Sequence, residues 1–261
     1  MKSKQADLYY FSGTGNTLLA AQELRAALAE NGVSVRLLRL EKSDPALADT
    51  SRAIGLAFPV AMSTYPFVWN FMRALPDANG TEAFMLATMA GGSFGLVGAL
   101  KRTLAAKGYT PVGACEVRMP MNIFYVAGEA FAQRRKISGL AGVRAYARSL
   151  ADGSATWPGK FILSDLAHWL YLLVIRSWKW QWHQRAFRFK VNGRLCNKCG
   201  LCGALCPVGN ITFKPEPEFG LKCEYCMRCA SYCPKQAIKT LFVYKDRTYK
   251  AAPLPYERVA D

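Results

Sequence analysis

Cysteine is almost missing from the first part of this 261-residue chain. Cys115 stands alone there, and every other one of the nine cysteines falls between residues 196 and 233. A secreted fold held by disulfides spreads its cysteines more widely, so this distribution argues against a disulfide framework. The first residues, MKSKQADLYYFSGTGNT, also lack the apolar stretch and cleavage site of a signal peptide. We therefore expect a cytoplasmic protein.

Acidic residues are scarce as well. The chain has 18 aspartates and glutamates against 34 lysines and arginines, which gives a formal net charge of +16. Such an excess of cations suits an acidic protein partner, an anionic membrane surface or nucleic acid. The chain has no helix-turn-helix or zinc-finger pattern to read a nucleic acid, so we do not expect nucleic acid as its partner.

Short apolar runs alternate with helical patterns through residue 152. We expect strands at residues 6–11, 33–40, 53–58, 83–88 and 111–118. We expect helices at residues 16–32, 65–75, 93–108 and 129–151. Strands separated by helices form a parallel sheet that is covered on both faces. The sequence therefore predicts a doubly wound α/β domain with a five-stranded parallel sheet over residues 1–152.

A stretch rich in glycine, serine and proline, residues 152–160, predicts the end of this domain. We expect residues 153–190 to form a connecting segment with an amphipathic helix over residues 161–190. The apolar stripe of this helix includes Trp169 and Leu173, and cations follow it. Its uncharged part is too short to span a bilayer. Two interpretations stay open: the stripe docks the two parts of the chain together, or it makes a peripheral contact with a membrane surface.

Two runs of cysteines share one spacing, C-x2-C-x2-C-x3-C-P, at residues 196–207 and 223–234. Thiolates are the soft ligands that iron–sulfur clusters need. A structural zinc site pairs two C-x2-C knuckles, and a third close cysteine followed by C-P would overfill one tetrahedral site. The spacing is that of bacterial two-cluster ferredoxins, and residues 191–242 resemble such a domain.

The resemblance implies a small α+β domain with two 4Fe-4S clusters, which together with a C-terminal tail takes up residues 191–261. In such domains the fourth cysteine of each run binds the cluster of the other run. One cluster would then be held by Cys196, Cys199, Cys202 and Cys233. The other would be held by Cys223, Cys226, Cys229 and Cys206.

A glycine- and hydroxyl-rich loop, FSGTGNT, lies between the first expected strand and helix, where backbone N–H groups favour an anion. It lacks the lysine of the ATP-binding loop, and Leu18 replaces the third glycine of the dinucleotide fingerprint. The loop resembles the flavin mononucleotide (FMN) phosphate loop of flavodoxins. The matching residues are Ser12, Thr14, Gly15, Asn16 and Thr17. A plain helix-capping turn is the alternative interpretation.

Two further loops follow the third and fourth strands and meet the same edge of the sheet, where flavodoxin-like folds bind flavin. The resemblance places the flavin ring between them, near Pro59 and with Tyr65 as a stacking residue. The backbone of the second loop would lie near the polar edge of the ring, at Met89, Ala90, Gly91 and Gly92. These loops lack the tryptophan and the acidic-tyrosine pattern usual in flavodoxins.

The whole chain resembles flavodoxin-ferredoxin fusion proteins of anaerobic microbes. The resemblance implies an electron-transfer iron–sulfur flavoprotein, an oxidoreductase-type carrier that exchanges electrons with an acidic redox partner protein. No side chain need act as a catalytic acid or nucleophile, because the cofactors carry the chemistry. Two alternatives stay open: an iron–sulfur redox sensor with a basic surface that binds nucleic acid, and a flavin-dependent reductase of a small substrate.

Overall fold

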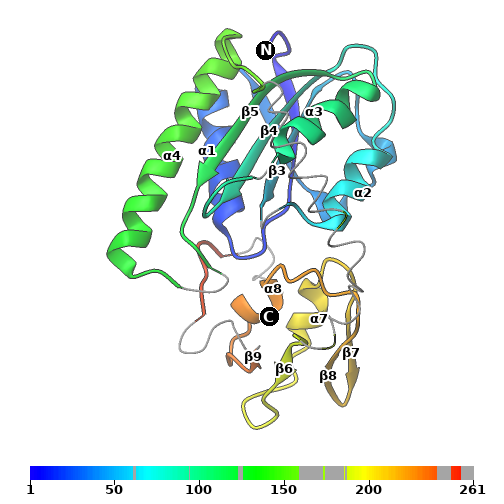
Figure 1. Ribbon diagram of the computed structural model, residues 1–261, viewed down its shortest axis with the longest axis vertical. Coiled ribbons are helices and arrows are strands. Elements are labelled where there is room, and N and C mark those ends of the chain that lie inside the picture. The colour runs from blue at the N-terminus through cyan, green and yellow to red at the C-terminus, as the bar shows by residue number, and fades with distance from the viewer. Residues whose placement is uncertain are drawn as a thin grey trace.

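The computed structural model describes residues 1–60, 63–93, 95–122, 126–158, 173, 185, 187–239 and 248–253. An α/β unit comes first, and a cysteine-rich region lies beneath one edge of its sheet (Figure 1). The strands of the α/β unit are β1 (Gln5–Tyr10), β2 (Ser34–Arg39), β3 (Ala53–Pro59), β4 (Glu82–Met89) and β5 (Thr110–Arg118). Its α-helices are α1 (Asn16–Glu30), α2 (Pro66–Ala74), α3 (Leu96–Ala106) and α4 (Glu129–Asp152).

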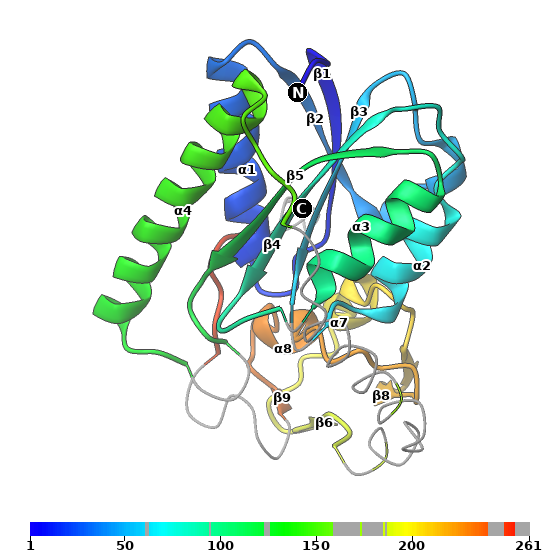
Figure 2. The ribbon, with the colours of Figure 1, turned by 45° about the horizontal axis from the view of Figure 1, so that its top comes forward.

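The sheet has the strand order β2-β1-β3-β4-β5, and every neighbouring pair is parallel. Helices α1 and α4 cover one face, and α2 and α3 cover the other (Figure 2). This is the flavodoxin-like doubly wound order. The predicted α/β domain is therefore confirmed, and its strands and helices lie close to the expected ranges. Two short 3-10 helices after β2, η1 (Leu40–Lys42) and η2 (Pro45–Leu47), were not expected.

The two faces of the sheet bury residues of different size. On β3, the large residues Ile54, Leu56 and Phe58 pack under α2 and α3, while small residues face α1 and α4. Gly55 is one of these small residues, and a Cβ at its position would lie 2.5 Å from the ring of Phe84. The glycine therefore makes room for a fully buried phenylalanine on β4.

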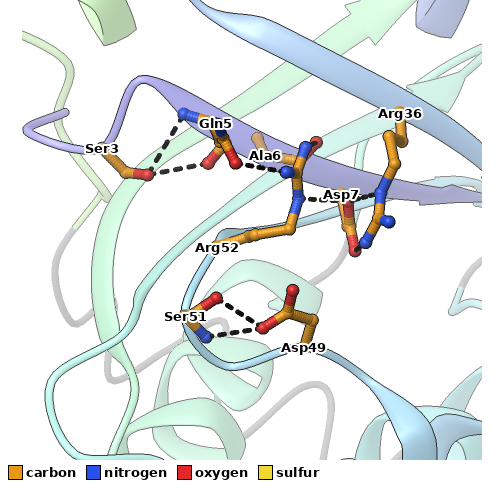
Figure 3. A network of polar contacts seen from close by, with 8 residues as sticks. All are labelled: Ser3, Gln5, Ala6, Asp7, Arg36, Asp49, Ser51 and Arg52. Carbon is orange, nitrogen blue, oxygen red and sulfur yellow. Dashed lines mark hydrogen bonds and ion pairs between the residues drawn. The ribbon is translucent and has the colours of Figure 1, made fainter.

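A polar network ties three neighbouring strands together near their amino ends (Figure 3). Asp7 on β1 is only 1% exposed and accepts hydrogen bonds from Arg36 on β2 at 2.7 Å and from Arg52 at 2.8 Å. Arg52 directly precedes β3 and also bonds Gln5. The two arginines neutralise a buried carboxylate, which would otherwise be costly to bury.

Residues after α4 remain attached to the α/β unit. Trp157 is buried in the core beneath α3, and its indole N–H donates to the Val97 carbonyl at 2.9 Å. Most of the expected helix at 161–190 lies outside the described residues, so its docking and membrane interpretations both stay predictions. Among the described helices, none is long and apolar enough to cross a membrane.

The cysteine-rich region contains short elements only. Strands β6 (Lys190–Val191) and β9 (Ile238–Lys239) pair antiparallel, and β7 (Ile211–Lys214) and β8 (Glu216–Phe219) form a tight hairpin. Each cysteine run carries one short helix, α7 (Leu201–Leu205) in the first and α8 (Arg228–Ser231) in the second. A small core, which includes Phe189 and Phe219, lies between these elements.

Candidate functional site

The glycine loop joins β1 to α1 and is almost completely buried. Gly15 caps the helix with φ of 98°, a left-handed conformation that glycine adopts without strain. The Ser12 hydroxyl accepts a hydrogen bond from the Gly15 N–H at 3.1 Å, and the Thr17 hydroxyl bonds that of Thr88 at 2.7 Å. These bonds hold the loop in shape and connect it to the end of β4.

The segment 248–253, which we call the C-terminal strap, lies over this loop. Ala251 N–H donates to the Thr14 carbonyl at 2.8 Å, and the Tyr249 hydroxyl donates to Asn16 Oδ1 at 2.7 Å. A Cβ at Gly15 would lie 2.5 Å from the strap nitrogen of Ala252. The strap therefore forms a wall of the site. No pattern in the polar C-terminal sequence predicted this position.

The other predicted flavin residues lie at the carboxyl ends of β3 and β4. These strands are neighbours, with Pro59 opposite Thr88, so both loops meet the glycine loop at one edge of the sheet. Tyr65 stacks on Phe67 at a centroid distance of 5.9 Å and meets Phe11 edge-on at 5.5 Å. The residues of the second loop change from buried to exposed along the chain, in the order Met89, Ala90, Gly91 and Gly92.

This edge leaves part of its backbone open to a ligand. Among the described residues, no atom lies within 4 Å of a Cβ built on Gly91 or Gly92, so this part of the chain leaves the backbone of the second loop open to a ligand. Tyr65 and Phe67 are partly buried aromatic residues after β3, and both rings pack edge-on against the fully buried Phe11. The loop from β1 offers hydroxyls and a helix N-terminus for a phosphate. The donor set at this edge therefore fits FMN.

The cysteines gather around two hollows. The first measures about 360 Å³, including space open to solvent, and the second about 340 Å³. The first is lined by Cys206, Cys223, Cys226 and Cys229. The second is lined by Cys196, Cys199, Cys202 and Cys233. Each hollow therefore takes three cysteines from one run and the fourth from the other, which is the crossed grouping that the ferredoxin resemblance implies.

Burial changes the chemistry of these thiols. It raises the pKa of Cys223 to about 12 and those of Cys202 and Cys226 to about 11, and neighbouring cysteines add to each shift. The thiols therefore keep their protons at neutral pH until a positively charged group binds and displaces those protons. Metal binding supplies such a charge and releases the protons.

The cysteines surround the hollows and do not converge on a point. Within the described parts of the chain, no three histidine, cysteine or acidic side chains are arranged to hold a metal ion. The choice between zinc and iron–sulfur clusters therefore stays a prediction from the sequence.

The turn of the second cysteine run lies against the glycine loop. The Cys226 carbonyl leaves no room for a Cβ on Gly13, and Phe67 N–H, in the first turn of α2, donates to Glu224 Oε2 at 3.4 Å. Burial raises the pKa of Glu224 to about 7. The hollow lined by Cys226 thus lies beside the candidate flavin edge, and we call it the inner hollow. The other, where Cys199 is exposed, is the outer hollow.

Solved structures of flavodoxins and flavodiiron proteins are similar to part of this chain. A Megasphaera elsdenii flavodoxin is 26% identical and has a TM-score of 0.40; the match covers 53% of this chain and 98% of the flavodoxin. Flavodoxin 2 from Bacillus cereus is 16% identical, with a TM-score of 0.45, over 57% of this chain and 98% of that one. The Giardia intestinalis flavodiiron protein is 21% identical, with a TM-score of 0.37, over 59% of this chain and 38% of its own.

No protein-family model and no curated protein matches the chain. The assignment of a flavodoxin-like fold rests on the strand order and parallel pairing of the sheet. The matches to these three structures cover between 53% and 59% of the chain.

Proposed function

We propose that this protein is an electron-transfer iron–sulfur flavoprotein that binds FMN and two 4Fe-4S clusters. The observation that carries the proposal is the crossed grouping of the cysteines, with the inner hollow against the glycine loop. An iron–sulfur sensor would need the two groups of four cysteines but not a flavin-type loop beside them, and a zinc protein would need no such loop either. The contact between the turn at Cys226 and the glycine loop supports an electron relay, because it would bring the two proposed cofactors close together.

The flavin supplies one- or two-electron chemistry, and each cluster supplies one-electron chemistry. The chain's own residues bind, orient and shield these groups. The glycine loop would bind the flavin phosphate. The hydroxyls of Ser12 and Thr17 fix the conformation of this loop through their hydrogen bonds. Phe11, Tyr65 and the C-terminal strap exclude water from the same edge.

The external partner is an acidic redox protein that approaches the outer hollow. Cys199 is exposed there, and Lys198 beside it is also exposed and lines the hollow. Cations around an exposed ligand attract an acidic surface and speed its encounter. The partner contact would therefore weaken as the ionic strength rises.

Anaerobic purification tests the proposal, with an absorption spectrum and assays of iron, acid-labile sulfide and flavin in the full chain. We expect one FMN per chain, with iron and sulfide in equal amounts at the level of two 4Fe-4S clusters. Zinc in place of iron, or iron without any flavin, would overturn the proposal. A matched chain with Cys226 and Cys229 changed to alanine should keep its FMN and lose about half of its iron, since three ligands of the outer hollow lie in the other run.

A further inference from the structure

We propose that Arg228 is a positioning residue that fixes the inner hollow against the glycine loop and raises the reduction potential of the cluster there. The inference rests on the proposed function and deepens it. It makes the two cluster sites unequal, with the Cys206, Cys223, Cys226 and Cys229 site next to the flavin. The site of Cys196, Cys199, Cys202 and Cys233 then faces the partner.

Arg228 begins helix α8, between two cysteines of the second run, and is only 2% exposed. Its Nε and Nη2 donate to the carbonyl oxygen of Ser12 at 3.0 and 2.8 Å. Its guanidinium lies 4.4 Å from the ring centre of Phe11. Phe11 and Ser12 directly follow β1, at the start of the glycine loop. Arg228 therefore contacts this start both by hydrogen bonds and by a cation–π interaction.

Glu41 is the counter-charge of Arg228. Arg228 Nη1 donates to Glu41 Oε1 at 2.8 Å, and the two side chains are 3% and 4% exposed. Burial alone would raise the pKa of Glu41, but the charge of Arg228, a backbone hydrogen bond, and hydrogen bonds from Arg228 and Arg39 hold the pKa below its ordinary value. The Oε2 atom of Glu41 is buried, and no partner for it lies in the described part of the chain.

The ion pair joins two parts of the chain that are distant in sequence. Glu41 lies in η1, directly after β2, and Arg228 lies in the cysteine-rich region. A buried ion pair fixes geometry strongly, because removal of one partner leaves the other charge unpaired away from water. Cys226 packs against the core of the α/β unit on the same side. Arg228 therefore holds the inner hollow in one position relative to the glycine loop.

A charge argument links this position to redox behaviour. A 4Fe-4S cluster with four thiolates is negatively charged and becomes more negative on reduction, and nearby charge is one of the factors that set its potential. Loss of Arg228 would leave the buried Glu41 carboxylate without its counter-charge, so the surroundings of the hollow would become more negative, whereas water screens the loss of an exposed cation. Arg228 is buried, whereas Lys222, also next to a cysteine of this hollow, is exposed. The two cations provide a matched pair for a test.

The first test is an anaerobic redox titration of the full chain, followed by absorption and electron paramagnetic resonance. Arg228→Met should lower the midpoint of one cluster by about 59 mV or more, which is a tenfold change in a one-electron equilibrium. The other cluster should keep its midpoint. Lys222→Met should move either midpoint by much less, and Arg228→Lys should recover most of the shift. Equal movement of both clusters, or no movement in iron-replete Arg228→Met protein, would overturn the redox part.

The second test is hydrogen exchange at the amides of residues 12–17 in full-length protein. Arg228→Met should raise exchange there about tenfold, since the docking contact that protects the loop is lost. Lys222→Met should leave it unchanged. Unchanged exchange in both variants would overturn the positioning role. If wild-type protein contains no iron, the proposed function fails, and the exchange result alone decides whether Arg228 positions the two regions.

Discussion

The α/β unit and the cysteine-rich region are held together by different means. In the α/β unit, β3 and β4 are buried almost along their whole length, and two large apolar clusters cover the faces of the sheet. In the cysteine-rich region, three of the four residues of β7 are exposed and the apolar cluster is small. Small regions with little core need cross-links or metals for stability. The proposed clusters would therefore stabilise this region as well as carry electrons.

The largest expected effect comes from the loss of a cluster ligand in the region with the small core. Cys229→Ala should lose about half of the iron and make residues 187–239 sensitive to protease, because the free energy of a structural metal site is on the order of 10 kcal/mol. The measurement is iron content together with limited proteolysis and mass spectrometry. Residues 1–158 should survive as a folded fragment. If the whole chain is degraded at one rate, the two regions do not differ as described.

A second substitution tests the stability of the α/β unit, the region with the large core. Phe84→Ala should lower the free energy of unfolding of the α/β unit by about 3–5 kcal/mol, since it leaves a cavity over Gly55. Phe131→Ala is the control: Phe131 is 48% exposed on α4, and its loss should change that free energy by about 0.5 kcal/mol or less. Denaturant titration followed by far-ultraviolet circular dichroism measures both. Equal effects of the two substitutions would show that the sheet does not supply the stability.

A substitution at the contact between the regions has an intermediate effect. Gly13→Ala places a methyl group against the backbone carbonyl of Cys226. Neither the glycine loop nor this carbonyl is a flexible side chain, so we expect about 1–3 kcal/mol of strain. The cysteine-rich region should then exchange its amides faster without losing iron. Gly91→Ala is the control, because open space surrounds that position. Hydrogen exchange separates the two variants, and identical exchange would contradict the contact.

The smallest expected effect distinguishes the lone cysteine from the clustered ones. Burial raises the pKa of Cys115 to about 12, so below that pH its thiol stays protonated and resists alkylation in the native protein. Cys115→Ala should cost about 1 kcal/mol and leave the iron content unchanged. Alkylation with mass spectrometry at pH 8, alongside an iron assay, checks both points. Iron loss in the variant would place Cys115 among the functional thiols, and rapid labelling would contradict its burial.

The features that sequence predicted well are local ones. The alternation of apolar residues indicates β3 and α1 because strand and helix periods are properties of a few consecutive residues. The spacing of the cysteines resembles that of two-cluster ferredoxins, and the crossed grouping that this resemblance implies agrees with the cysteines that line each hollow. Strand order follows from these elements once the glycine loop suggests a flavodoxin-like sheet.

The features that sequence missed depend on distant contacts. Arg228 and Glu41 are 187 positions apart, and an arginine beside cysteines reads as an ordinary exposed cation. The strap over Gly15 comes from a polar tail that has no period or motif. Only packing of the complete chain brings such residues together, so local patterns carry no signal for them.

Electron paramagnetic resonance of fully reduced, anaerobically purified full-length protein tests the relay most directly. Two 4Fe-4S clusters held by the crossed cysteines should give a signal broadened by magnetic interaction between them, in protein that also contains one FMN per chain. Wild-type protein that gives no iron–sulfur signal on reduction, or the signal of one isolated cluster, would contradict the relay.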